Sequence, residues 1–143
     1  MIDPATGELR LPSADVVLGP RLTRESFLAS RLAEHARILV VNEPHCRYVV
    51  SVPPGEPGEM AWRVSLQFHG PSLVSLDLGA SDARFGTSWD DWTEEKQQAL
   101  RRYHDEWLER TCGLKPGRYS WGELESGVTD PKGGTSSILV RYR

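Results

Sequence analysis

The sequence predicts a single α+β domain over residues 1–143, with a mostly antiparallel, twisted sheet and two helices over about 22–36 and 93–112. Three observations lead to this prediction. Several short segments alternate apolar and polar residues, as strands with one buried face do. Two longer segments repeat their apolar residues at helical spacing and carry helix-start signals. The length of 143 residues suits one hydrophobic core.

The chain begins with an arm that leads into the first helix. Residues 7–20 contain two short alternating runs, which indicate a small hairpin or an extended arm. The helix over 22–36 opens with Thr23, a typical N-cap residue, and Leu22 and Phe27 have the spacing of a hydrophobic staple. Its apolar residues recur along one stripe, which we expect to be buried.

The middle of the chain reads as strands. Residues 37–41 form an apolar, partly β-branched run that predicts a buried strand, and 47–52 predict a second one. The proline- and glycine-rich segment 53–59 is typical of a loop. Residues 61–70 alternate most clearly, and 72–79 follow after a short turn. These last two segments should therefore pair as an antiparallel hairpin.

The last third predicts the long helix and two more strands. Over 93–112, acidic residues come first and basic residues later, which suits the helix dipole, and Gly113 ends the helix. Residues 118–126 and 136–143 alternate and predict strands. The apolar stripe of the helix comprises Leu100, Tyr103 and Trp107.

The connection between those strands holds the residue types of a phosphate-binding loop, in Lys132-Gly133-Gly134-Thr135. In such loops the lysine follows the glycines and a helix N-terminus faces the phosphate. Here the lysine precedes the glycines and a strand follows. The context therefore favours a hairpin turn, with display of the turn to a partner as the alternative.

Composition and charge exclude several function classes. The net charge is −3 and no basic run occurs, so we expect no nucleic-acid partner. No stretch approaches the ~18 consecutive apolar residues of a membrane span, and the first residues lack the pattern of a signal peptide. Two cysteines do not make a disulfide framework. We therefore expect a cytoplasmic protein with reduced thiols.

Few residues carry the marks of catalysis. The histidines lack metal-ligand spacing, and neither a nucleophile-elbow motif nor a zinc-protease motif occurs, so we expect no metal, no cofactor and no catalytic residue. Cys46 with His69 or His104 as a distant base is the alternative, but a lone cysteine at a strand start is usually a packing residue. Asp90 and Asp91 are alternative Mg²⁺ ligands, although adjacent acids before a helix commonly serve its dipole.

The segment 85–95 is the most unusual stretch, because it combines tryptophans with carboxylates and no base. One interpretation is a helix entry, capped by Ser88 or Thr93, whose tryptophans fill the core. The other is an acidic, aromatic patch that docks a basic protein. The candidate partner-binding residues are Trp89, Asp90, Asp91, Glu94 and Glu95.

The two tryptophans of this segment should differ in exposure. If Trp92 starts the buried stripe that continues through Leu100, then Trp89 and the acids lie off that stripe, toward water. We therefore expect Trp89 to be at least partly exposed and to contact the partner.

Two strings also carry a resemblance. They are L-G-x-x-L-T-R-x-x-F at 18–27 and W-G-x-x-x-S-x-x-x-x-x-K-G-G-x-S-S-I at 121–138. With them, nearly the whole chain resembles a family of small bacterial proteins that is similar to the immunity proteins encoded beside polymorphic toxins, including contact-dependent and type VI systems. The resemblance implies a cytosolic, non-enzymatic protein that binds a cognate protein, and it supplies no functional residue.

Two other function classes stay open at this point. One is a small-molecule-binding domain or enzyme with a pocket near Cys46 or under the 53–59 loop. The other is a structural subunit with no separate activity. A deep apolar pocket with a histidine beside the thiol would favour the enzyme, whereas a filled core with an exposed Trp and acid patch would favour the protein-binding module. The sequence does not specify the oligomeric state.

Overall fold

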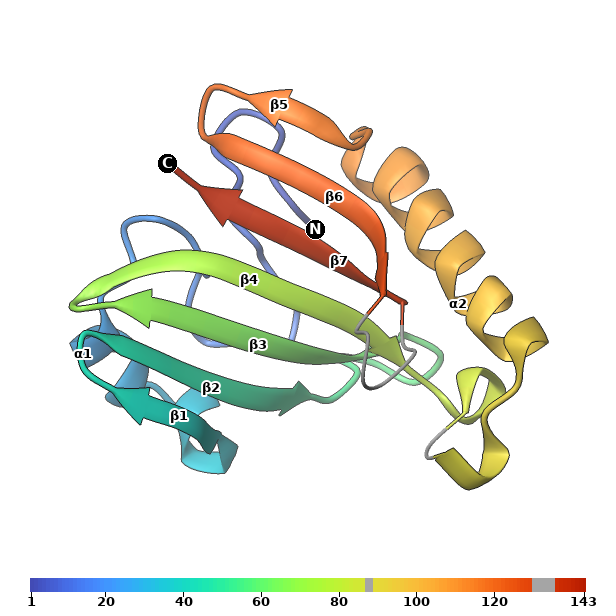
Figure 1. Ribbon diagram of the computed structural model, residues 1–143, viewed down its shortest axis with the longest axis horizontal. Helices are drawn as coiled ribbons and strands as arrows, with labels where there is room; N and C mark the ends of the chain where they lie inside the picture. Colours follow the sequence, from blue (N-terminus) through green and yellow to red (C-terminus); the bar gives the residue numbers. More distant parts are fainter. Residues whose placement is uncertain (87–88, 130–135) are drawn as a thin grey trace.

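In the computed structural model, which describes residues 1–86, 89–129 and 136–143, the strands form one seven-stranded antiparallel sheet of order β1-β2-β3-β4-β7-β6-β5 (Figure 1). This confirms the predicted single α+β domain with a mostly antiparallel sheet. The strands are β1 (Arg37–Asn42), β2 (His45–Val52), β3 (Ala61–His69), β4 (Ser72–Ser81), β5 (Gly117–Tyr119), β6 (Gly122–Thr129) and β7 (Ser136–Tyr142).

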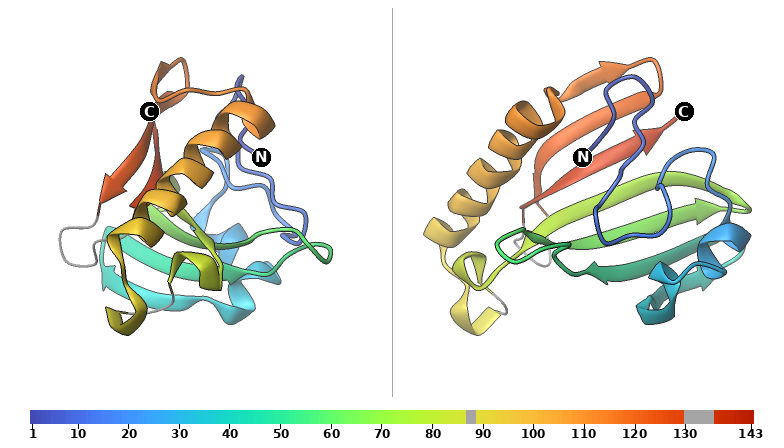
Figure 2. Two further views of the ribbon diagram at one scale, coloured as in Figure 1. Left: turned by 90° about the vertical axis from the view of Figure 1, so that its right-hand side faces the viewer. Right: turned by 180° about the vertical axis from the view of Figure 1, so that it is seen from behind.

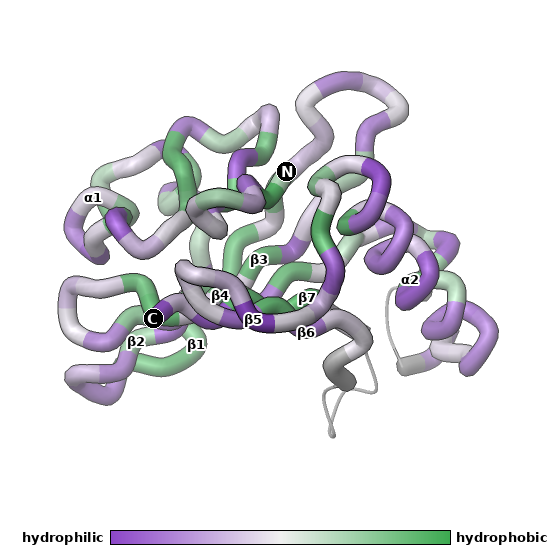
Figure 3. The backbone as a smooth tube through the Cα atoms, turned by 90° about the horizontal axis from the view of Figure 1, so that it is seen from above, coloured by the Kyte–Doolittle hydropathy of each residue, from purple (hydrophilic) through white to green (hydrophobic). Residues whose placement is uncertain are grey.

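The helices and the N-terminal arm lie on one side of the sheet and leave the other face open (Figures 2 and 3). An antiparallel sheet can keep one face solvated, because only the covered face needs apolar side chains. The long helix α2 packs against β4, β6 and β7. The helical segments are α1 (Arg24–Leu28), the 3₁₀ helices η1 (Leu32–His35), η2 (Ala83–Phe85) and η3 (Trp89–Asp91), α2 (Glu94–Trp107) and its π-helical end η4 (Leu108–Cys112).

The N-terminal arm, residues 1–20, consists of turns and bends held together by two isolated antiparallel bridges, Ile2 with Leu9 and Leu9 with Leu18. Trp121 fixes it to the sheet by donating its indole N–H to the carbonyl of Pro4 at 3.0 Å. Gly122 follows at φ 151°, and a Cβ there would collide with the backbone of Arg141. Trp121 therefore seats the arm on the sheet, and Gly122 allows the close approach of the β7 backbone.

The first helix is shorter than predicted. Thr23 caps it as expected, accepting a hydrogen bond from the backbone N–H of Ser26 at 3.1 Å. The helix nevertheless ends at Leu28, and only the 3₁₀ turn η1 follows before the sheet. The carboxylate of Asp15 accepts from the backbone N–H groups of Arg31 and Leu32 at 2.8 and 3.0 Å. A continuous helix would need those two donors for its own ladder, so Asp15 ends it.

The prediction that residues 37–41 form a buried strand is wrong in burial, although β1 is a strand. All six residues of β1 are exposed. β1 is the terminal strand of the described sheet, so it has a neighbour on one side only. An apolar run indicates burial only for a central strand, and the sequence does not show which strand lies at the edge.

The central hairpin agrees with the prediction, with one shift. β3 and β4 pair antiparallel, and β3 buries its alternating apolar residues. A bulge between Gln67 and Phe68 places Leu73 opposite Phe68. As a result Leu73, and not Val74, lies in the core with Leu76.

The helical segment formed by α2 and η4 begins and ends where predicted. Thr93 is its N-cap, and Gly113 ends the helical segment with a left-handed backbone at φ 67°. Its buried residues are Leu100 and His104, whereas Tyr103 and Trp107 of the predicted stripe are only half-buried. Among the described residues, no helix combines the length and the apolar content that crossing a bilayer requires.

Candidate protein-binding site

The candidate site is the entry to α2, where the chain leaves η3 and starts the helix. The Thr93 hydroxyl oxygen accepts from the backbone N–H of Lys96 at 3.1 Å, which fixes the first turn. Glu94 and Glu95 lie in that turn and are exposed. Their charges face the positive end of the helix dipole, so the helix tolerates this concentration of carboxylates.

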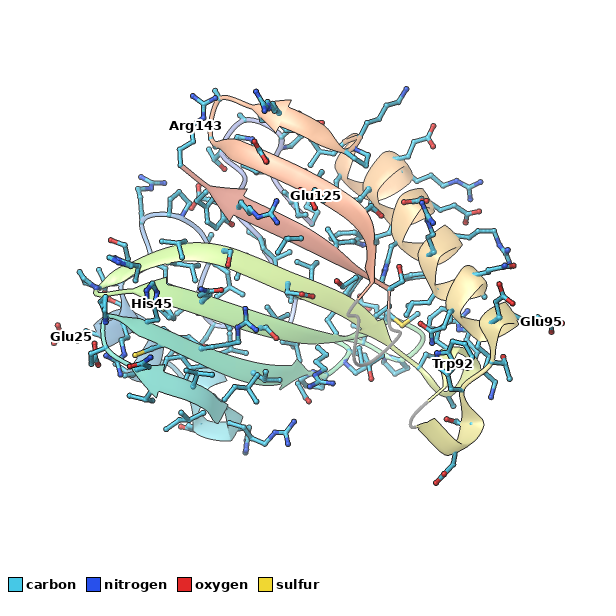
Figure 4. The ribbon with its side chains drawn as sticks, in the orientation of Figure 1. Glu25, His45, Trp92, Glu95, Glu125 and Arg143 are labelled. Carbon is cyan, nitrogen blue, oxygen red and sulfur yellow. The ribbon has the colours of Figure 1, made fainter. Side chains whose placement is uncertain are left out.

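Trp92 is the exposed tryptophan that the structure describes at this entry. Its side chain is 39% exposed, and it lies at the same end of the molecule as Glu95 (Figure 4). The prediction that Trp92 starts the buried stripe is therefore wrong. Thr93 has extended backbone angles, φ −139° and ψ 153°, so Trp92 precedes the helix and is not in phase with its buried face. The side chain of Trp89 lies outside the described part of the structure, and its exposure stays a prediction.

The two aspartates of η3 occupy different positions. Asp90 is exposed and Asp91 is half-buried. The ammonium group of Lys96 donates to the backbone carbonyl of Asp91 at 2.7 Å, which ties η3 to the first turn of α2. We call Asp90, Asp91, Trp92, Glu94 and Glu95 the α2-entry patch. Among the described side chains, no group of three or more His, Cys, Asp or Glu residues could hold a metal ion.

Packing and hydrogen bonds join the start of α2 to η2 and β7. Phe85 in η2 is buried and packs against Tyr103 of α2, with ring centroids 5.6 Å apart. The Gln97 side chain donates to the Phe85 carbonyl at 3.4 Å and accepts from the backbone N–H of Ser136 at 3.2 Å. One side chain thus joins η2, α2 and β7.

The surroundings of Cys46 do not suit a catalytic thiol. Cys46 is 1% exposed, and burial raises the pKa of its thiol. Its sulfur donates to Glu43 at 3.6 Å, and Glu43 in turn pairs with Arg24 at 2.8 Å. His69, which the sequence offered as a base, is exposed at the end of β3, whereas its neighbour Phe68 points into the core beside Cys46. Nucleophile and base therefore lie on opposite faces of the sheet.

The other candidate base, His104, is buried in a different part of the core. Its Nε2 accepts from the backbone N–H of Ala80 at 3.0 Å, and its ring stacks on Trp62 with centroids 6.1 Å apart. Desolvation lowers the pKa of His104 to about 4. The lowered pKa keeps the imidazole neutral, so that Nε2 stays an acceptor for the Ala80 N–H. This hydrogen bond to the sheet backbone holds α2 in place.

A cavity of about 340 Å³ lies where the 53–59 loop ends. Its walls include the aromatic side chains of Trp62, Tyr103 and Trp107, and the Trp62 and Trp107 ring centroids are 4.6 Å apart. Glu59 is the one carboxylate in its lining. The sequence leaves two places open for a small-molecule pocket, near Cys46 or under the 53–59 loop. The cavity agrees with the second place and not with the first.

The glycine-rich segment that the sequence singled out, residues 132–135, lies outside the described residues. The strands on either side of it, β6 and β7, are antiparallel neighbours. The predicted pairing of these strands is therefore confirmed, and the conformation of the segment between them stays a prediction.

Comparison with known proteins places the fold. No protein-family model matches the chain, and no curated protein sequence matches it. One chain of a solved structure, described as "Rhs1-CT in complex with cognate immunity protein RhsI1", shares the fold with a TM-score of 0.67 and 18% sequence identity, over 99% of this chain and 86% of that chain. At this identity the match establishes a common fold, and it agrees with the resemblance to immunity proteins of polymorphic toxins.

Proposed function

We propose that this chain is a non-enzymatic, cytoplasmic immunity protein that neutralises a cognate bacterial toxin by binding it through the α2-entry patch. The observation that carries the proposal is Trp92, exposed at 39% and flanked by exposed carboxylates on a fixed helix entry. The fold shared with a chain of a toxin–immunity complex gives independent support.

The composition of the patch specifies the partner's chemistry. A tryptophan supplies a large apolar surface at low entropic cost, and such residues are the usual anchors of protein interfaces. Asp90, Glu94 and Glu95 surround it with negative charge and would steer a basic surface toward it. We therefore expect the toxin to present a pocket for an indole ring, rimmed by lysine or arginine.

The test takes the product of the neighbouring gene as the candidate toxin and measures both rescue from its toxicity and binding to it. Bacteria that express the toxin should survive when the parent chain is co-expressed and should lose protection with Trp92→Ala. Calorimetry should show that this substitution weakens binding by roughly 2 kcal/mol or more, as the loss of an interface anchor does.

A matched charge control uses the same helix. Glu94→Gln with Glu95→Gln should weaken binding, whereas Glu106→Gln with Glu109→Gln, both exposed farther along the helical segment, should not. If Trp92→Ala binds the toxin as the parent does, the interface lies elsewhere and the proposed site is wrong. If the parent binds no product of the neighbouring gene, the immunity role itself fails.

The aromatic cavity at the 53–59 loop supports a second candidate, a small-molecule-binding domain. Trp62, Tyr103 and Trp107 give it stacking surfaces, and Glu59 gives it a carboxylate. A planar cationic ligand suits that chemistry. A thermal-shift screen of such compounds discriminates the two, because hits lost with Trp107→Ala and kept with Trp92→Ala would favour the ligand-binding function.

A further inference from the structure

The edge strand β1 exposes an apolar surface that the proposed toxin site does not use. Its central side chains, all large and apolar, keep about half of their area in water. The exposed fractions are 64% for Ile38, 47% for Leu39, 48% for Val40 and 52% for Val41. In the described sheet no strand lies beyond β1 (Figure 1), so its outer backbone groups also face outward. Such an edge is a template for another strand.

The opposite edge of the sheet is protected in the way that edges usually are. β5 is only three residues long, and its exposed Arg118 pairs with Glu123 of β6 at 3.4 Å. Within residues 38–41, all of which the structure describes, no proline and no charge interrupts the apolar run. β1 has a bulge between Ile38 and Val40 as its one irregularity. The contrast indicates that another strand pairs with the β1 edge.

The charges at the ends of β1 indicate what covers it. Arg37 opens the strand and is exposed, and Glu43 follows its last residue. Glu43 keeps 62% of its side chain exposed although it pairs with Arg24. If a second β1 runs antiparallel about a two-fold axis at Val40, the bulge brings Arg37 of each copy to the Asn42–Glu43 end of the other, where Glu43 is the nearest acidic residue along the chain. A parallel pairing would instead bring like charges together.

We propose that β1 pairs antiparallel with β1 of a second copy of this chain, about a two-fold axis at Val40, and so joins the two sheets. The contact is isologous, because the same surface serves both copies and closes on itself. It places the apolar side chains of the two strands beside one another and pairs the outer backbone groups of both strands. One six-residue strand per copy is small beside a standard interface of ~1,600 Å², so we expect a dimer of micromolar affinity.

The first test is the oligomeric state of the full chain by sedimentation velocity over a concentration series. The parent should dimerise, and Val40→Lys should weaken the dimer by at least ~10-fold, because the two-fold axis would set one lysine against the other. Ser51→Lys is the matched control, since Ser51 is an exposed position of β2 beyond the reach of β1. It adds the same charge and should leave dimerisation unchanged. Circular dichroism confirms that both variants fold.

The second test measures the register in which the two β1 strands pair. Cys46 and Cys112 are buried, so an added thiol on the surface is the accessible one. Val40→Cys should form a disulfide-linked dimer under mild oxidation, because the two residues at the axis lie directly opposite each other. Ser51→Cys should stay monomeric on a non-reducing gel. A parent that remains monomeric up to millimolar concentration, or a dimer that Val40→Lys leaves intact, would overturn the proposal.

Discussion

His104 makes the stability of this protein depend on pH in a way that one substitution can isolate. The imidazole has no exposed surface, and its Nε2 accepts from the backbone N–H of Ala80. The neutral ring therefore carries its proton on Nδ1, which has no hydrogen-bond partner among the described residues. Protonation would remove the acceptor for Ala80 and bury a charge, and for that reason desolvation lowers the pKa from 6.5 to about 4, against a small opposing effect of Asp105.

The sign follows from proton binding. Above pH 6.5 the ring is neutral in both the folded and the unfolded chain, and it adds no pH dependence. As the pH falls below that value the unfolded chain binds a proton and the folded chain does not, so the free energy of unfolding decreases. The decrease stops near pH 4, where the folded chain also binds the proton. With ~1.4 kcal/mol per pKa unit, the loss is about 2 kcal/mol at about pH 5 and roughly 3 kcal/mol at the lower limit.

The assay is urea unfolding followed by circular dichroism, at about pH 7.5 and about pH 5. His104→Gln keeps an acceptor for the Ala80 N–H and cannot titrate, so its free energy of unfolding should change by about 2 kcal/mol less than the parent's between the two pH values. Gln loses the stacking on Trp62, so we expect it to be less stable at neutral pH. His35→Gln, at an exposed position, is the control and should follow the parent. If the parent and His104→Gln lose the same free energy, the buried-histidine argument is wrong.

Three further changes test other parts of the structure. Thr93→Ala removes the N-cap of α2 and should lower the free energy of unfolding by about 1 kcal/mol, measured by urea unfolding with Thr111→Ala as the control. Cys46 should react with iodoacetamide far more slowly than free cysteine at neutral pH, because burial raises its pKa; a fast reaction followed by mass spectrometry would contradict its packing role. Asp90→Asn with Glu94→Gln should slow association with the toxin and flatten its salt dependence in stopped-flow measurements, and an unchanged salt slope would exclude steering by these acids.

The local signals in the sequence predicted the local structure well. Thr93 and Gly113 bound the long helical segment as their residue types indicate, and the alternating run of β3 buries the face that its pattern specifies. These features depend on neighbours along the chain, so the sequence displays them directly. The same holds for the acidic residues at the start of α2, which indicate the beginning of a helix from the sequence alone.

Two of the failures concern contacts between distant segments. Nothing near residues 22–36 shows that Asp15 takes the backbone donors of Arg31 and Leu32 and ends the first helix. Nothing in the apolar run of β1 shows that it lies at the sheet edge. The exposure of Trp92 was predictable in principle, because an N-cap at Thr93 already implies that the preceding residue is out of helical phase.

The two surfaces proposed here are separable, and that separation is itself a test of both. β1 lies at the sheet edge beyond β2, whereas Trp92 lies at the start of α2, toward the other end of the molecule (Figures 1 and 4). A dimer joined through β1 therefore keeps both α2-entry patches free to bind toxin. Val40→Lys should weaken dimerisation and leave the toxin affinity unchanged, whereas Trp92→Ala should weaken toxin binding and leave dimerisation unchanged. If Val40→Lys weakens toxin binding instead, the β1 edge belongs to the toxin interface, and the self-complementary charges of Arg37 and Glu43 do not select a second copy.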